Sequence, residues 1–134
     1  MTHRTIHIRG WRVDVFIDDG GDSDFGIVTD CLFDMGAPEE IIGNAVEKYR
    51  MGKPNEAFTT TVGRRACIYI GWTTSSEEFL NSIIHELRHL VDFIAEYYGI
   101  DDREAVGYMS GDAAFLLAED ICEHGCPHCG KEER

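Results

Sequence analysis

The chain has 134 residues, which suits one domain with its own hydrophobic core. Its 43% hydrophobic and 10% aromatic content argues against a disordered chain, and no apolar run is long enough to cross a bilayer. Acidic residues outnumber basic ones by 25 to 12, and the formal net charge of -13 disfavours nucleic acids and anionic membrane surfaces as partners.

The N-terminal part of the chain predicts strands. Residues 5–18 alternate apolar and polar side chains around Gly10-Trp11, a pattern typical of a β-hairpin. The segment from Asp18 to Asp24 is polar and contains glycine, but it lacks the final glutamate and the flanking helices of an EF-hand. We therefore interpret it as a plain loop rather than a calcium site. Phe25 to Thr29 predicts a further short strand.

A helix and a second hairpin are predicted next. Pro38 to Met51 has the apolar spacing of a helix, with proline at its start and Gly52 just after its end. Phe58 to Val62 and Ala66 to Trp72 predict two strands joined by a turn at Gly63-Arg64. The two hairpins would make a small antiparallel sheet with the helix inserted between them.

The C-terminal half predicts two long helices. The capping-box pattern Ser75-x-x-Glu78 begins a helix from about Ser76 to Tyr98, which ends at Gly99. Asp101-x-x-Glu104 similarly begins a second helix that runs to about Cys122. We therefore expect an α+β fold, with a small antiparallel sheet, one inserted helix and two long C-terminal helices. Residues 1–121 would form one domain, and residues 122–134 a tail rich in cysteine and histidine.

The first of these helices contains the sequence His85-Glu86-Leu87-Arg88-His89. Residues four apart share a helix face, so the two imidazoles can bind one zinc ion while the carboxylate of Glu86 deprotonates an attacking water. At 100° per residue, the polar residues around the motif lie within about 60° of each other: His85, His89, Asp92 and Glu96. The alternative is a solvated face that contains two histidines by coincidence.

A catalytic zinc ion needs a third protein ligand. Glu104 is our first choice, because a hairpin of two helices would return it to the histidine face, although it can also be the capping partner of Asp101. Asp92 better suits an acceptor for an imidazole N–H. Weaker candidate ligands are Asp101, Asp102 and Asp112. Tyr108, one turn after Glu104, can stabilise an oxyanion, or it can be a core aromatic with its hydroxyl in water.

The motif followed by Glu104 on a later helix resembles the zincin metallopeptidases, specifically the gluzincin type. This resemblance implies His85, His89 and Glu104 as zinc ligands and Glu86 as the catalytic base. It also implies that the strand from Ala66 to Trp72 is the edge strand along which an extended peptide would pair. The fold would then be a minimal zincin-like domain.

The wider pattern is similar to short uncharacterised HExxH proteins of phages and gut Bacteroidetes. The residues that carry this similarity are Pro54-Asn55-x-x-Phe58-Thr59, Phe79-x-Asn81-x-x-x-His85-Glu86-x-x-His89 and Glu104-x-x-x-Tyr108-x-x-Gly111-Asp112. The similarity covers about residues 54 to 113, and it implies no particular substrate.

The C-terminal tail contains a Cys-x-x-Cys core with further cysteine and histidine residues around it. Zinc knuckles use such spacing, so a second zinc ion at Cys122, Cys126 and Cys129 is one interpretation. A reduced tail that binds metal adventitiously and a redox pair are the others. Because no secretion signal is visible, we expect the five cysteines to be reduced and the protein to be cytoplasmic.

Three functions compete on this sequence. The leading hypothesis is a zinc-dependent peptidase that acts on a peptide or protein substrate. The second is a catalytically silent zinc-binding module for protein interaction, such as a phage-encoded modulator of a host protein. The third is a structural protein whose histidines only pack.

Overall fold

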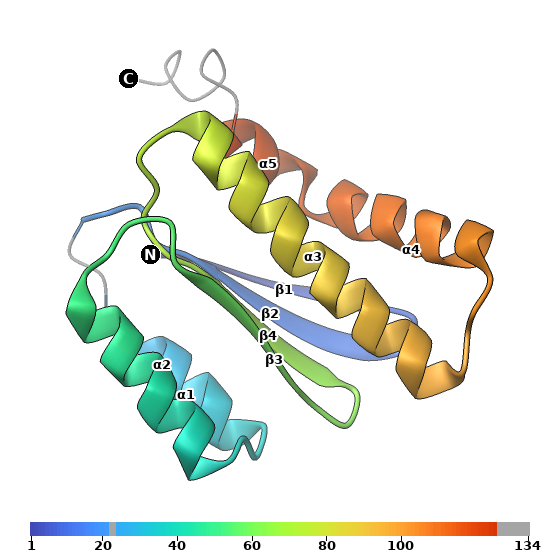
Figure 1. The fold of residues 1–134 in the computed structure, drawn as a ribbon, viewed down its shortest axis with the longest axis horizontal. Helices are drawn as coiled ribbons and strands as arrows, with labels where there is room; N and C mark the ends of the chain where they lie inside the picture. The colour runs from blue at the N-terminus through green and yellow to red at the C-terminus, as the bar shows by residue number, and fades with distance from the viewer. Residues whose placement is uncertain (22–23, 126–134) are drawn as a thin grey trace.

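The structure, a computed structural model, describes residues 1–21 and 24–125 and places a four-stranded sheet between two helical layers (Figure 1). The strands are β1 (Thr2–Ile8), β2 (Trp11–Ile17), β3 (Ala57–Val62) and β4 (Arg65–Ile70). The helices are α1 (Gly26–Asp34), α2 (Glu39–Met51), α3 (Ser76–Tyr98), α4 (Arg103–Leu116) and α5 (Ala118–Gly125). The predicted α+β class is confirmed.

The sheet has the strand order β1-β2-β4-β3. Both hairpins are antiparallel as expected, but β2 and β4 pair in parallel, so the sheet is mixed rather than wholly antiparallel. The central position of β4 follows from its composition, because Ala66 to Ile70 are all buried and therefore need cover on both faces. The less apolar strand β3 lies at the edge.

Two helices, rather than the one expected, connect β2 to β3. Residues from Phe25 onward, expected to form a strand, begin helix α1 instead. The reason is a helical spacing of buried apolar residues, since Phe25, Val28 and Leu32 all point into the core. The carboxylate of Asp24 accepts a 2.8 Å hydrogen bond from the amide of Gly26, which turns the chain into the helix.

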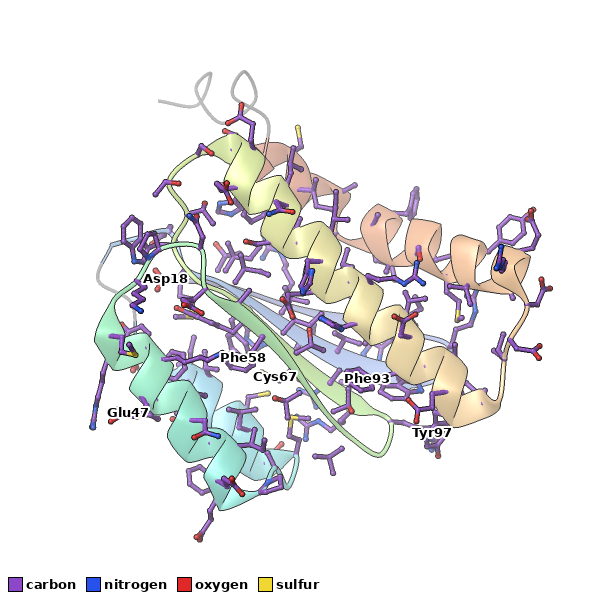
Figure 2. All side chains as sticks on the ribbon, in the orientation of Figure 1. Asp18, Glu47, Phe58, Cys67, Phe93 and Tyr97 are labelled. Atoms are coloured by element: carbon purple, nitrogen blue, oxygen red, sulfur yellow. The ribbon has the colours of Figure 1, made fainter. Side chains whose placement is uncertain are left out.

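Each face of the sheet has its own hydrophobic core. On one face, alternate strand residues pack against α3. Fully buried residues of this core include Val13, Val15 and Ile68 from the strands and Leu90 and Ile94 from α3. On the other face, the remaining strand residues pack against α1 and α2, and Figure 2 shows Phe58 and Cys67 pointing toward these helices. This alternation decides which residues of β3 face α3.

Helix α3 has the predicted bounds. The Oγ atom of Ser75 accepts a 3.1 Å hydrogen bond from the amide of Glu78, and Gly99 adopts the left-handed conformation that ends the helix. The second predicted helix is divided at Leu117 into α4 and α5. Residues 122–125, which we assigned to the tail, belong to α5, whereas Cys126 and Cys129 lie outside the described residues.

Candidate metal centre

His85 and His89 lie on the exposed face of α3, and their rings contact each other through the Nε2 atoms. Their Nε2 atoms are 3.0 Å apart, and the ring planes meet at 84°. Two nitrogens bound to one tetrahedral zinc ion at about 2.0–2.1 Å are separated by roughly 3.3 Å, so this pair fits a shared ion. Without a metal, the same contact is a hydrogen bond between one protonated and one unprotonated nitrogen.

The side chain of Glu86 extends from α3 to the edge strand β3. It is 5% exposed, and its Oε1 accepts a 2.8 Å hydrogen bond from the hydroxyl of Thr59. Thr59 can reach it because alternate residues of β3 face α3. His85 and Glu86 line the same cavity, so a general base on Glu86 would act beside the first of the two imidazoles.

A cavity of about 230 Å³ opens beside this carboxylate. Its walls come from the segment before β3 and from the first half of α3, and they are Asn55, Glu56, Ala57, Asn81, Ser82, His85 and Glu86. The amide of Asn81 and the hydroxyl of Ser82 can bond a peptide backbone, whereas the amide of Asn55 is bonded to Thr74. The sequence reasoning named none of these three as site residues, although two of them stand in the pattern around the motif.

The strand nearest the motif is β3 rather than β4. We expected residues 66–72 to be the edge strand, but β4 lies inside the sheet between β2 and β3. Within residues 1–21 and 24–125, β3 pairs only with β4, so its other edge has backbone N–H and C=O groups without a strand partner there. The strand available for pairing with a peptide is therefore residues 57–62.

The structure does not bring Glu104 or Tyr108 to the histidine pair. Glu104 lies in the first turn of α4, after the end of α3 at Tyr98, and His89 lies about 14 Å before that end along α3. Tyr108 is 68% exposed. At 100° per residue, both lie opposite the face of α4 that packs against the core, which contains Val106, Ala113 and Leu117.

Other candidate ligands also have different partners. Both carboxylate oxygens of Asp92, expected to accept from an imidazole, are bonded instead by Nε of Arg88, at 3.1 and 3.2 Å. Asp112 forms an ion pair with Arg9, and Asp102 caps α4. Among the described residues, no third histidine, cysteine or acidic ligand atom lies within 4.8 Å of both imidazoles.

A second group of residues on α5 could hold a metal ion. Ligand atoms of Asp120, Glu123 and His124 lie within 4.8 Å of one another. The carboxylate of Asp120 is buried and accepts from Nε of Arg4 at 3.1 Å, while Nε2 of His124 is buried without a hydrogen-bond partner among the described residues. The sequence suggested Cys122, Cys126 and Cys129 as ligands of a second zinc ion here, as one of three interpretations of the tail. The signal that sequence reasoning missed is the Asp120-x-x-Glu123-His124 spacing, which puts three ligands on one helix side.

Comparison of the chain with protein-family models, with curated proteins and with solved structures finds no match. In the described part of the chain, no helix has the length and apolar character needed to span a membrane. Functional inference therefore starts from the side chains and their geometry.

Proposed function

We propose that this chain is a zinc-dependent peptidase in which His85 and His89 hold the metal ion and Glu86 is the general base. One observation carries the proposal: two imidazole nitrogens lie 3.0 Å apart, and one of these histidines lines a cavity with a buried carboxylate that contacts the edge strand β3. Chemistry of this kind needs metal ligands, a base and a place for the substrate. His85 and His89 support the first role, Glu86 the second and the edge of β3 the third.

The proposed reaction is hydrolysis of a peptide bond. When bound, zinc supplies Lewis-acid chemistry that acidifies a water molecule and polarises the substrate carbonyl. Glu86 takes a proton from the water as its oxygen attacks the carbonyl carbon, and it delivers that proton to the amide nitrogen as the C–N bond breaks. The products are a new carboxyl group and a new amino group. The hydroxyl of Thr59 fixes the orientation of the Glu86 carboxylate throughout.

The substrate would lie along β3. An extended peptide can add a strand to the free edge of β3, where backbone hydrogen bonds provide affinity without requiring a particular sequence. Such a peptide would pass the cavity beside Glu86, and the scissile carbonyl would face His85 and His89. This placement supports peptide hydrolysis, because a strand presents backbone carbonyls at regular spacing.

Among the described residues, His85 and His89 are the two ligands that the site supplies. Catalytic zinc sites have three protein ligands, and two are present here. For Glu104 to become the third, α4 would have to rotate by roughly half a turn about its axis and to move along α3. A catalytically silent zinc-binding module needs no open, three-ligand site, so the two-ligand geometry favours this function as the second candidate.

Metal binding is the first test. Metal-free protein should bind one zinc ion at the histidine pair in competition with a chromogenic chelator, and His89→Ala should weaken this binding by at least tenfold. His7→Ala, which removes an exposed histidine of β1, and His124→Ala, which removes a ligand of the α5 group, should leave it in place. Equal zinc binding by the His89→Ala variant would exclude a site at the histidine pair.

Turnover is the second test. Zinc-loaded protein is incubated with a fluorescence-quenched peptide library, and Glu86→Gln serves as the variant that retains zinc and loses the base. Cleavage by the wild type alone supports the peptidase. Zinc binding without cleavage by either protein would support the silent module instead.

A further inference from the structure

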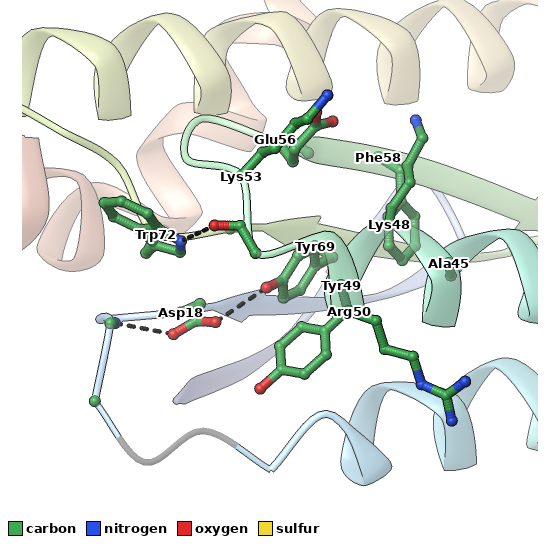
Figure 3. A pocket seen from close by; sticks show the side chains of 15 residues that line it. Asp18, Ala45, Lys48, Tyr49, Arg50, Lys53, Glu56, Phe58, Tyr69 and Trp72 are labelled. Carbon is green, nitrogen blue, oxygen red and sulfur yellow. Dashed lines mark hydrogen bonds between the residues drawn. The ribbon is translucent and has the colours of Figure 1, made fainter.

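A cavity of about 300 Å³ lies on the α2 side of the sheet, and we name it the α2 pocket (Figure 3). It is formed by the end of α2, the segment before β3 and the end of β4. Aromatic rings line much of it: Tyr49, Phe58, Tyr69 and Trp72. The indole N–H of Trp72 donates a 3.3 Å hydrogen bond to the carbonyl of Gly52, which holds this ring at the rim.

Three basic side chains also line the α2 pocket, Lys48, Arg50 and Lys53, in a chain with a net charge of -13. They include both lysines of the described residues. Among the described residues, none of the three has a carboxylate oxygen within 4.0 Å; the ion pairs of the described part involve other basic groups. In Figure 3 the ammonium groups of Lys48 and Lys53 extend toward β3, while Arg50 turns the other way.

Two carboxylates belong to the same pocket. Asp18 is 8% exposed and accepts hydrogen bonds from the hydroxyl of Tyr69 at 3.0 Å and from the amide of Gly20 at 2.9 Å. The carboxylate of Asp18 is therefore occupied by hydrogen bonds within the protein, which dashed lines mark in Figure 3. Glu56 is the other carboxylate among the described residues that line the pocket, and with Lys48 and Lys53 it leaves an excess of positive charge at the β3 side.

The α2 pocket adjoins the candidate metal centre. Glu56 and Ala57 line both this pocket and the cavity beside Glu86. Successive residues of β3 point to opposite faces, since Thr59 reaches Glu86 on the α3 side while Phe58 lines the α2 pocket. Side chains of a peptide paired with β3 would alternate in the same way.

We propose that the α2 pocket binds an acidic side chain of the peptide substrate, next in sequence to the residue that faces His85 and His89. The proposal rests on the peptidase function and specifies its substrate class. A carboxylate there meets the ammonium groups of Lys48 and Lys53, while the methylene groups that precede it pack on the ring of Phe58. Because this contact is partly solvated, each lysine contributes roughly a fivefold preference, and added salt weakens it.

The test compares peptides that differ at one position. Glutamate, glutamine or lysine is placed in turn at each position that flanks a cleaved bond, and kcat/KM is measured for each peptide. The wild type should prefer glutamate at one flanking position. Lys48→Glu/Lys53→Glu should abolish that preference, and Arg103→Glu, which makes the same kind of charge change on α4, should retain it. Equal kcat/KM for the three peptides would overturn the inference while leaving the peptidase function intact.

A binding measurement separates this inference from the peptidase function. In Glu86→Gln protein, acidic peptides should quench the fluorescence of Trp72 at the rim of the pocket, and Trp72→Phe identifies that signal against the buried Trp11. Tighter binding of glutamate than of lysine peptides supports the pocket, even if the wild type cleaves nothing. Equal binding of both peptides overturns the pocket whether or not cleavage occurs.

Discussion

The hydroxyl of Thr59 donates a 2.8 Å hydrogen bond to Oε1 of Glu86 and thereby connects the edge strand to the motif helix. The carboxylate has little contact with solvent, so this bond fixes which oxygen faces the cavity. If Glu86 is the base, its orientation depends on a residue that lies 27 positions earlier in the chain.

Replacing Thr59 by valine keeps the shape of the side chain and removes the donor. We expect kcat/KM to fall by about 10- to 100-fold, the usual effect of losing a bond that orients a catalytic group, with zinc affinity unchanged. Steady-state kinetics and zinc competition measure the two quantities. Thr59→Ser should recover activity, and Thr60→Val, on the opposite face of β3, should have little effect. Loss of zinc binding in Thr59→Val would show that the bond supports the fold rather than the base.

Glu104→Ala and Tyr108→Phe should leave zinc affinity unchanged. Both side chains lie on the face of α4 that points away from the core, and neither approaches the histidine pair. Competition with a chelator measures the affinity, and His85→Ala is the positive control. A tenfold weaker zinc complex in Glu104→Ala would instead reveal a second arrangement of α4 in which this residue is a ligand.

Stability at low pH should depend on Asp14, a residue of β2 that is 1% exposed. Burial alone would raise its pKa, but hydrogen bonds from Thr5 and His3 and the charge of Arg12 hold the pKa below the ordinary value of 3.8. A carboxyl group whose pKa is lower in the folded state stabilises that state at pH values above the pKa of the unfolded state. This contribution disappears as the pH falls through the folded-state pKa.

The Asp14→Asn variant tests this expectation. At neutral pH it should lower the free energy of unfolding by about 1–3 kcal/mol, because Thr5 and His3 lose a charged acceptor that is itself buried. The difference from the wild type should be constant above pH 5 and should shrink below about pH 4. Urea unfolding at a series of pH values measures it. A difference that grows on acidification would contradict the assigned sign.

The N-cap of α3 should contribute to stability independently of the site. Ser75→Ala removes the acceptor for the amide of Glu78, and a loss of about 1 kcal/mol is expected in urea unfolding. Ser76→Ala, inside the first turn, is the matched control, since the side chain of Ser75 alone caps the helix. Equal destabilisation by both substitutions would argue against a capping role.

The sequence was most informative where local signals agreed. The helix with the histidine motif has an apolar stripe, a capping serine and a terminal glycine, and its bounds are those expected. The order of the strands was not predictable in the same way, because pairing between β2 and β4 joins distant segments. The edge strand was therefore assigned to the wrong member of the second hairpin.

The orientation of α4 was partly predictable. Val106, Met109, Ala113 and Leu117 recur at helical spacing, and this stripe indicates which face meets the core. Glu104 lies about 160° from Val106, so the stripe points it outward. The length of the helical connection predicts only that the two helices are neighbours. Rotation about the axis, which decides whether a side chain can reach a metal, has to be inferred from the stripe.

The parallel pairing of β2 with β4 has a consequence for how the chain folds. All of α1, α2 and β3 are synthesised before β4, so the N-terminal hairpin leaves the ribosome with its inner edge unpaired. An open strand edge of this kind promotes association between chains, and pairing of distant segments is slow. Fragments that end before Ile70 should therefore aggregate, because the two halves of the sheet are joined only once β4 has been made.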